Sequence, residues 1–404
     1  MNKSFCILPW NSIATNPDGS IKPCCISTDR IKKSDGTNFN LGHDKIEDFY
    51  NSPDYVTIKE KMLNGEEVSG CVQCIQSESY GKESQRTVFN NMYKHMLTQT
   101  SAIAEIDIEH FNLRLGNLCN LKCRSCVPSD SSQLDKQVIE HPELQKYYTN
   151  FGFNYNEWYE TEIFQENVFS NLEKLNMLSI TGGEPTLIKK SFELLEKLST
   201  TGYSKNICLI IHSNMTNDNP EFFDLISQFK EIVFFVSLDG YKDIQEYLRY
   251  PSNWNQLSNN LEKLVSRNCP NITIKVAPVV QIANIGNIVD LFEYCEEFNR
   301  KAGRLVVDIR LQPLEFPDHL NIIHLPNDYK LACWNRIEDW VQKRCNYQKP
   351  LFHSQLSSLK TKCLVKVEYS EILDKFFDFT ELVDKQQRLT LQEVNPELAQ
   401  LQYK

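Results

Sequence analysis

The sequence predicts an α/β protein in which helices connect the strands of a parallel sheet. Strand-like apolar runs alternate with amphipathic helical stretches through the middle of the chain, which is typical of βαβ units. A cysteine-rich loop follows the first of these strands, and a glycine-rich turn follows the second. Because parallel α/β folds gather their chemistry at the carboxyl ends of the strands, we expect the functional site there.

Composition limits the class of protein. The chain has 404 residues, of which 41% are hydrophobic and 24% charged, as in an ordinary globular protein with a large core and one smaller module. No apolar run reaches the ~20 residues that span a bilayer, and the first residues lack a signal peptide's apolar core, so we expect a cytoplasmic protein with no membrane partner. A net charge of −10 argues against a nucleic-acid partner.

The N-terminal module, predicted over residues 1–80, is rich in cysteine. A turn at Asn16–Gly19 separates two strand-like runs, and the resulting hairpin brings Cys6 near Cys24. Cys71 and Cys74 form a C-x2-C pair, a spacing that lets two thiolates bind the same metal ion or cluster. The module therefore holds either an iron–sulfur cluster or a structural zinc ion. Cys25 is either a spare thiol beside Cys24 or a ligand in its place.

Two helical segments follow the hairpin. Lys45–Leu63 carries apolar residues at helical spacing, with an interruption at Pro53. Glu78–Thr98 also has an apolar helical face, and we expect a linking helix along the core within residues 81–104.

The core is predicted over residues 105–320 and contains six strand candidates. They are Phe111–Gly116, Met177–Thr181, Ile207–His212, Ile232–Leu238, Ile272–Val280 and Val306–Leu311. Apolar residues at helical spacing lie between them, for example at Leu257, Leu261 and Leu264.

Cys119, Cys123 and Cys126 stand in a C-x3-C-x2-C arrangement just after the first core strand. Three cysteines are one ligand short of filling a four-iron cluster or a tetrahedral zinc site. A cluster with an open iron can bind a small molecule, whereas a zinc knuckle would need a distant fourth ligand.

This cysteine spacing, followed by Thr181-Gly182-Gly183-Glu184-Pro185, resembles the radical S-adenosylmethionine (radical SAM) enzymes. The resemblance implies a partial (β/α)6 TIM-type barrel that is open on one side. It implies that Cys119, Cys123 and Cys126 hold a [4Fe-4S] cluster whose fourth iron chelates the amino and carboxylate groups of SAM.

The same resemblance implies a set of SAM contacts. Gly182, Gly183 and Glu184 would hold the amino group of SAM, and Asn214 would face the cofactor. Ser237 would contact its ribose side, and Arg249 would bind its carboxylate, because the planar guanidinium can donate two parallel hydrogen bonds. Asn284 is a further candidate near the adenine, with loop capping as the alternative. Ser125 departs from the family, which often has an apolar residue covering the adenine.

The N-terminal module resembles the twitch module, a shortened relative of the SPASM domain. Its pattern is met by Cys6, by Gly19 with Cys24, and by Cys71 with Cys74. The resemblance implies a second, auxiliary [4Fe-4S] cluster with four protein ligands.

The C-terminal part, residues 321–404, is predicted to be helical over Leu331–Val341, Leu356–Val367 and Ile372–Leu391, and to close the open side of the barrel. Asp384 and Arg388 are expected to pair on an exposed face. His212 is expected to be a hydrogen-bonded core residue. The remaining cysteines are expected to be packing residues: Cys208, Cys269, Cys295, Cys333, Cys345 and Cys363.

Together these features predict a radical SAM enzyme of oxidoreductase or transferase type. The resemblance implies reductive cleavage of SAM to a 5′-deoxyadenosyl radical, which abstracts hydrogen from a substrate, and a flavodoxin- or ferredoxin-type electron donor. A peptide or protein side chain is the expected substrate. The alternatives are a small metabolite as substrate, and a non-catalytic zinc-binding adaptor.

Overall fold

The computed structural model describes residues 3–79, 83–97, 101–155, 157–344, 350–367 and 371–403. It divides into two compact units, the first formed by residues 1–118, 153–211 and 220–232, and the second by residues 119–152, 212–219 and 233–404. The domain boundaries drawn from the sequence stay predictions. In the described part of the chain, no helix combines the length and apolar character needed to cross a membrane.

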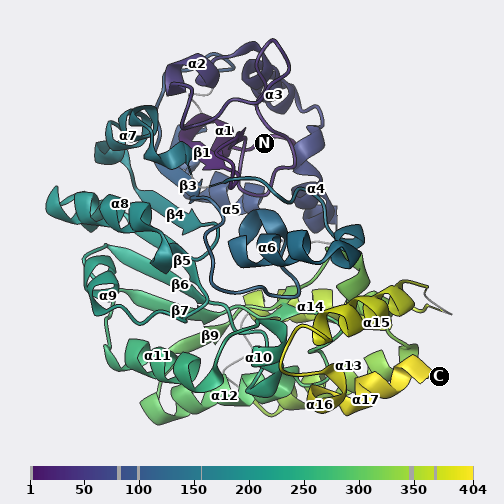
Figure 1. Cartoon of the computed structure of the whole chain (residues 1–404). Coiled ribbons are helices and arrows are strands. Elements are labelled where there is room, and N and C mark those ends of the chain that lie inside the picture. The colour runs from purple at the N-terminus through teal and green to yellow at the C-terminus, as the bar shows by residue number, and fades with distance from the viewer. Residues whose placement is uncertain are drawn as a thin grey trace. The chain divides into compact units, whose positions relative to one another are not determined.

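The first unit is built on a sheet with the strand order β2-β1-β3-β4-β5 (Figure 1). These strands are β1 Ser12–Thr15, β2 Ile21–Lys22, β3 His110–Arg114, β4 Met177–Thr181 and β5 Cys208–Ser213, the last of which ends in the second unit. The predicted hairpin is present, because β1 pairs with β2 in antiparallel register. β1 also pairs in parallel with β3, with Ser12 opposite His110, so the hairpin extends the sheet.

The helices of the first unit follow the predicted pattern in part. They are α1 Leu8–Asn11, α2 Ile46–Tyr50, α3 Pro53–Asn64, α4 Val72–Ser79, α5 Gln85–Met92, α7 Glu162–Phe169, α8 Lys189–Thr200 and α9 Pro220–Ile226. The interruption at Pro53 is confirmed, since this proline opens α3. The expected linking helix is shorter than predicted, because among the described residues of Glu78–Thr98 the α-helical part after α4 is confined to α5. The Phe89 ring of α5 stacks on His110 of β3 at 5.4 Å.

The second unit contains β6 Glu231–Val236 from residue 233 onward, β7 Ile272–Val276 and β9 Val307–Ile309, in the order β6-β7-β9. β7 and β9 are parallel, and Lys275 lies opposite Asp308. The single strand predicted over Ile272–Val280 is divided, because Pro278 has no N–H for the ladder. Its second half, β8 Val279–Val280, pairs in parallel with β10 Gln312–Pro313.

The helices of the second unit are α6 Ser132–Glu140, α10 Asp243–Leu248, α11 Trp254–Ser266, α12 Ile288–Ala302, α13 Asn327–Gln342, α14 Pro350–Leu364, α15 Glu371–Asp384, α16 Leu391–Val394 and α17 Pro396–Ala399. Leu257, Leu261 and Leu264 of α11 are buried, as their spacing predicts. α15 ends at Asp384, seven residues before the predicted Leu391. Mostly parallel strands joined by helices confirm the α/β fold class.

Candidate active site

The three cysteines of the C-x3-C-x2-C motif lie in one loop of the second unit. Cys119 and Cys123 are buried and pack with Leu121, and Cys126 packs against this cluster. The backbone N–H of Cys126 donates to the Cys123 carbonyl at 3.1 Å, which turns the loop back on itself. The hydroxyl of Ser132, the first residue of α6, accepts from the Cys119 N–H at 3.2 Å and so fixes the loop to this helix.

Cys123 and Cys126 lie where burial opposes ionisation of the thiol. Burial raises the pKa of Cys123 to about 12, and it raises the pKa of Cys126 well above its ordinary value. Cys119 contributes to the rise in both pKa values, and Arg249 opposes the rise at Cys123. Binding iron would replace the thiol protons, and the positive charge of the iron would offset the repulsion between the thiolates. Three convergent thiols therefore fit a [4Fe-4S] cluster with one iron left for another ligand.

Arg249 lies beside the cysteine loop. Its Nε and Nη2 donate to the Asp239 carboxylate at 2.7 and 3.2 Å, and its Nη1 lies 3.8 Å from Cys123 Sγ. Burial alone would lower the pKa of Arg249, but Asp239 and Cys123 raise it above its ordinary value. Arg249 is therefore a fixed cation next to Cys123, and not a solvated helix residue.

Asn214 and Ser237 are placed at the carboxyl ends of β5 and β6. The Asn214 amide donates to Asn120 Oδ1 at 2.9 Å, and its Nδ2 is 4.0 Å from Cys119 Sγ. Ser237 is half-buried, and its N–H donates to the Ser213 carbonyl at 2.9 Å. The second unit thus brings the three cysteines together with Asn214 and Arg249.

Asn284 is completely buried, and its amide donates to the carbonyls of Asp239 and Val279 at 2.7 and 2.9 Å. This is the loop-capping role left open by the sequence. His212 is half-buried and its ring stacks on Phe235 at 4.3 Å, so it lies on the partly exposed face of β5 and not deep in the core.

Gly182, Gly183 and Glu184 belong to the first unit, directly after β4. Gly182 and Gly183 have φ values of +85° and +50°, which favour glycine. A Cβ on Gly183 would lie 2.2 Å from the carbonyl oxygen of Leu118, the residue that precedes Cys119 in the sequence. The Glu184 N–H donates to the same carbonyl at 2.8 Å. The Glu184 carboxylate is buried and accepts from the Thr186 hydroxyl at 2.7 Å, which caps the following turn.

The cysteines of the N-terminal module meet in the first unit. Cys6, Cys24, Cys71 and Cys74 line one small cavity of about 20 Å³, whose lining does not include Cys25. Burial, together with the neighbouring thiols, raises the pKa of Cys24 to about 12 and that of Cys71 to about 11. Four convergent thiols around a cavity fit an auxiliary [4Fe-4S] cluster. Among the described residues, no group of three or more His, Cys, Asp or Glu side chains is placed to hold a single metal ion, whereas a four-iron cluster binds its thiolates on separate irons.

The sequence did not point to Arg86, which lines the same cavity. Its Nη1 donates to the Phe5 carbonyl at 3.1 Å, and its Nε donates to Glu78 at 2.9 Å. No short-range pattern marks this residue, because its contacts depend on the fold around residues 5–86.

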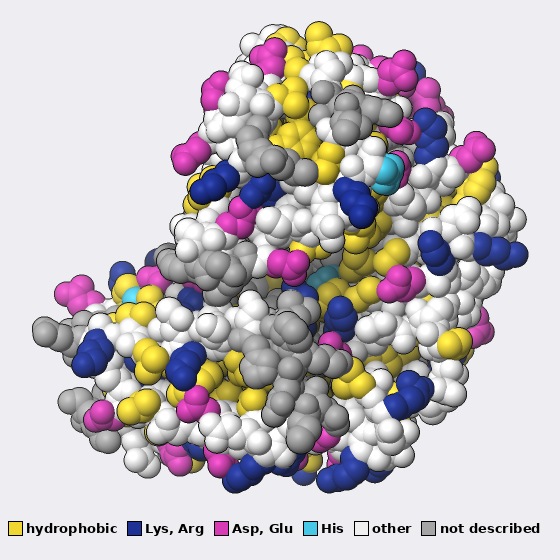
Figure 2. Space-filling model, turned by 180° about the vertical axis from the view of Figure 1, so that it is seen from behind, with side chains coloured by type: hydrophobic (Ala, Val, Ile, Leu, Met, Phe, Trp, Pro, Cys, Tyr) yellow, Lys and Arg dark blue, Asp and Glu magenta, His cyan; other side chains and the backbone are white. Residues whose placement is uncertain are grey.

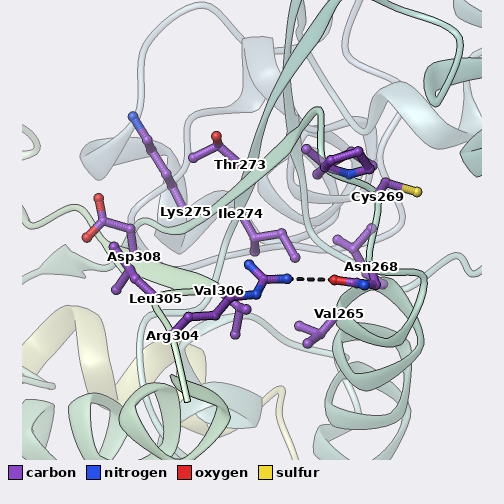
Figure 3. Close-up of a pocket in the computed structure, with 13 residues that line it drawn as sticks. Val265, Asn268, Cys269, Thr273, Ile274, Lys275, Arg304, Leu305, Val306 and Asp308 are labelled. Atoms are coloured by element: carbon purple, nitrogen blue, oxygen red, sulfur yellow. Dashed lines mark hydrogen bonds between the residues drawn. The ribbon is translucent and has the colours of Figure 1, made fainter. Parts of the chain in front are cut away.

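A cavity of about 400 Å³ lies in the second unit near the amino ends of β7 and β9, at the strand ends opposite to those that carry Ser237 and Asn214. Figure 3 shows Arg304 reaching across it to Asn268, with a hydrogen bond of 2.6 Å, and Lys275 near Asp308 at its side. On the face shown in Figure 2, side chains of both charge signs are interspersed.

Of the other cysteines, Cys295, Cys333 and Cys363 are buried, and Cys208 and Cys269 are half-buried. This burial is compatible with packing roles. Cys345 lies outside the described residues.

Two family models match the chain. That of the radical SAM superfamily matches residues 113–295, and that of an iron–sulfur cluster-binding domain, SPASM, matches residues 6–75. No curated protein sequence matches the chain.

Similar solved structures include anSMEcpe with bound AdoMet, at 15% identity and a TM-score of 0.35. The match covers 56% of this chain and 58% of that one, so the chain spans less than two thirds of this relative. SuiB of Streptococcus suis bound to S-adenosylmethionine is similar at 12% identity and a TM-score of 0.36, covering 78% of this chain and 67% of that one. SuiB bound to the precursor peptide SuiA gives 11% identity and a TM-score of 0.35, covering 82% and 70%.

Proposed function

Because the chain belongs to the radical SAM superfamily and carries an iron–sulfur cluster-binding domain ahead of that core, we propose that it abstracts hydrogen from a peptide or protein side chain. Its cofactors are SAM, a [4Fe-4S] cluster and an auxiliary cluster. When bound, the reduced core cluster and SAM supply the carbon radical that removes the hydrogen.

The observation that supports this assignment best is the arrangement around Cys123. Three thiols of one loop stand beside Arg249, whose orientation Asp239 fixes. In this proposal Cys119, Cys123 and Cys126 hold the core cluster. Arg249 then places a positive charge where the SAM carboxylate binds, and Asn214 and Ser237 line the same strand ends. Gly182, Gly183 and Glu184 are assigned to the SAM amino group.

In the N-terminal module, Cys6, Cys24, Cys71 and Cys74 are proposed to hold the auxiliary cluster. Four protein ligands leave no open iron, so electron relay is a better role for this cluster than substrate binding. A small electron-transfer protein of the flavodoxin or ferredoxin type is the proposed donor.

The peptide substrate is supported by the module type and by the Ser237-Leu238-Asp239-Gly240 run, which resembles that of peptide-modifying members. The net charge of −10 also makes a nucleic acid a poor substrate.

Two experiments test the proposal. The anaerobically reconstituted protein should form 5′-deoxyadenosine from SAM under dithionite, and the Cys119→Ala/Cys123→Ala/Cys126→Ala variant should form none. Unchanged cleavage by this variant would refute the core assignment. Co-expression with short open reading frames beside the gene should then give a peptide that has lost two hydrogens or taken up deuterium. Turnover with a metabolite extract, without any altered peptide, would replace the peptide with a small molecule.

A further inference from the structure

Arg124 lies between two of the motif cysteines, and its side chain is almost completely buried at 2% exposure. Its guanidinium stacks on the Tyr247 ring at 3.8 Å, and its Nε donates to the Tyr247 carbonyl at 3.1 Å. Its Nη2 donates to the carboxylate of Asp384 and, at 3.0 Å, to Gln387 Oε1. Asp384 is the last residue of α15, so this ion pair joins the cysteine loop to the C-terminal helices.

The backbone around Arg124 is tied to the segment that carries Arg249. The Arg124 N–H donates to the Leu248 carbonyl at 2.9 Å, and the Lys122 N–H donates to the Tyr250 carbonyl at 2.7 Å. These two bonds flank Arg249, whose Nη1 lies 3.8 Å from Cys123 Sγ. Residue 124 therefore connects the cysteine loop, the Arg249 segment and α15.

Other contacts hold the end of α15 on the same region. Phe379 of α15 packs edge-on against Tyr148 at 6.2 Å between ring centres. Gln137 of α6, the helix that follows the loop, donates to Gln386 Oε1 at 2.6 Å. The second carboxylate oxygen of Asp384 accepts from the Leu391 N–H at 2.7 Å, which fixes the orientation of this group.

A buried ion pair is a poor choice if stability alone is required, because apolar residues of similar shape often serve as well or better. Here the pair even leaves Arg124 Nη1 without a hydrogen-bond partner among the described residues. What the planar guanidinium provides is a defined geometry, because it donates at the same time to the fixed Asp384 carboxylate, to Gln387 and to the Tyr247 carbonyl.

We propose that the C-terminal end of α15 positions the cysteine loop, with Asp384 holding Arg124 so that Cys123 stays in register with Arg249. This rests on the proposed function, since it assigns a role in SAM binding at that site. It gives the end of α15, which lies outside the matched range 113–295, an indirect part in SAM binding. Arg124 and Asp384 are positioning residues, because their side chains contact each other, Tyr247 and Gln387 and act on the site through the backbone of the loop.

The test uses the reconstituted full-length enzyme and follows the EPR spectrum of its reduced clusters during a SAM titration. Asp384→Asn should keep its iron but need at least tenfold more SAM for the spectral change, and Asp384→Glu should recover part of the loss. The matched control is Asp378→Asn, on the same helix, where the carboxylate is exposed. The Asp378→Asn variant should show the EPR change at the same SAM concentration as the wild type.

The double variant Arg124→Met/Asp384→Leu separates positioning from stability, because it replaces the buried pair with apolar side chains. We expect it to unfold at a temperature near that of the wild type and still to show the weakened SAM response. If this variant or Asp384→Asn showed the EPR change at the same SAM concentration as the wild type, the inference would be overturned. If the wild type itself shows no SAM-dependent spectrum, the proposed function fails instead, and the two failures are distinguishable.

Discussion

Arg249 and Asp239 form a bidentate ion pair, with hydrogen bonds of 2.7 and 3.2 Å, next to the sulfur of Cys123. Asp239 is completely buried. Its Oδ1 also accepts from the Val279 N–H at 2.8 Å, and its own carbonyl accepts from Asn284. The carboxylate thus anchors the guanidinium to the loops that follow β6 and β7, which makes Arg249 a rigid donor.

Replacing Arg249 with Lys should weaken SAM binding by about tenfold or more. An ammonium group keeps the positive charge but lacks the planar set of donors with which the guanidinium pairs with Asp239. The expected size follows from the worth of a hydrogen bond to a charged group, about 1.5–3 kcal/mol. The measurement is the SAM dissociation constant of the reconstituted enzyme. Lys263→Met is the control, since Lys263 forms an exposed ion pair with Asp218 elsewhere on the same unit. Equal SAM affinity in Arg249→Lys and the wild type would contradict the assignment.

The sequence predicted this neighbourhood because its parts are short motifs at strand ends. Ser237–Gly240 and Arg249 are 9 to 12 residues apart, and parallel strands bring their carboxyl ends to one edge. The periodicity of α11 predicted which of its residues are buried, since a helix with one covered face must repeat apolar residues at 3.6-residue spacing.

Relationships between distant residues were missed. The predicted exposed pair of Asp384 and Arg388 is wrong, because Asp384 pairs with Arg124, 260 residues away. Helical spacing identifies only neighbours on one helix, and tertiary contact decided this partner. The parallel pairing of β1 with β3 was missed for the same reason, since strand pairing over about 100 residues leaves no local pattern.

The N-terminal cysteines should account for half of the iron. A fully loaded chain should hold about eight irons, as two four-iron clusters. Cys6→Ala/Cys24→Ala/Cys71→Ala/Cys74→Ala should keep about four of them. Iron and zinc are measured together by elemental analysis.

Cys25→Ala is the matched control, because Cys25 adjoins Cys24 but is not among the residues that line the cavity. It should retain the full iron content. A wild-type chain with about four irons and one zinc would instead identify the module as a zinc site.

Gly183→Ala should destabilise the first unit by more than backbone strain alone. A left-handed alanine costs about 1–2 kcal/mol. The added Cβ would also lie 2.2 Å from the Leu118 carbonyl, and relieving such overlap costs typically about 1–3 kcal/mol more. Gly202→Ala isolates the strain, since Gly202 has a φ of +79° and open space around its Cβ position. Urea unfolding of both variants measures the difference, and equal losses would show that the close approach to Leu118 is unimportant.

His110 should make the protein sensitive to mild acid. Burial lowers its pKa from 6.5 to about 3, and its ring stacks on Phe89 of α5. Below pH 6.5 His110 is protonated in the unfolded chain, whereas it stays neutral in the folded chain. The stability contributed by neutral His110 is therefore complete above pH 6.5 and is lost as the pH falls toward 3, by roughly 1.4 kcal/mol per pH unit.

His110→Leu removes this proton uptake, whatever its effect on stability at neutral pH. Between pH 6.5 and 5.0 the wild type should lose roughly 2 kcal/mol more than the variant, from the same slope over 1.5 pH units. The measurement compares the free energies of unfolding in urea at the two pH values, so that acid effects shared by both proteins cancel. His43→Leu is the control, because His43 is exposed. It should lose as much stability as the wild type. Parallel losses in His110→Leu and the wild type would mean that His110 accepts a proton in the folded state.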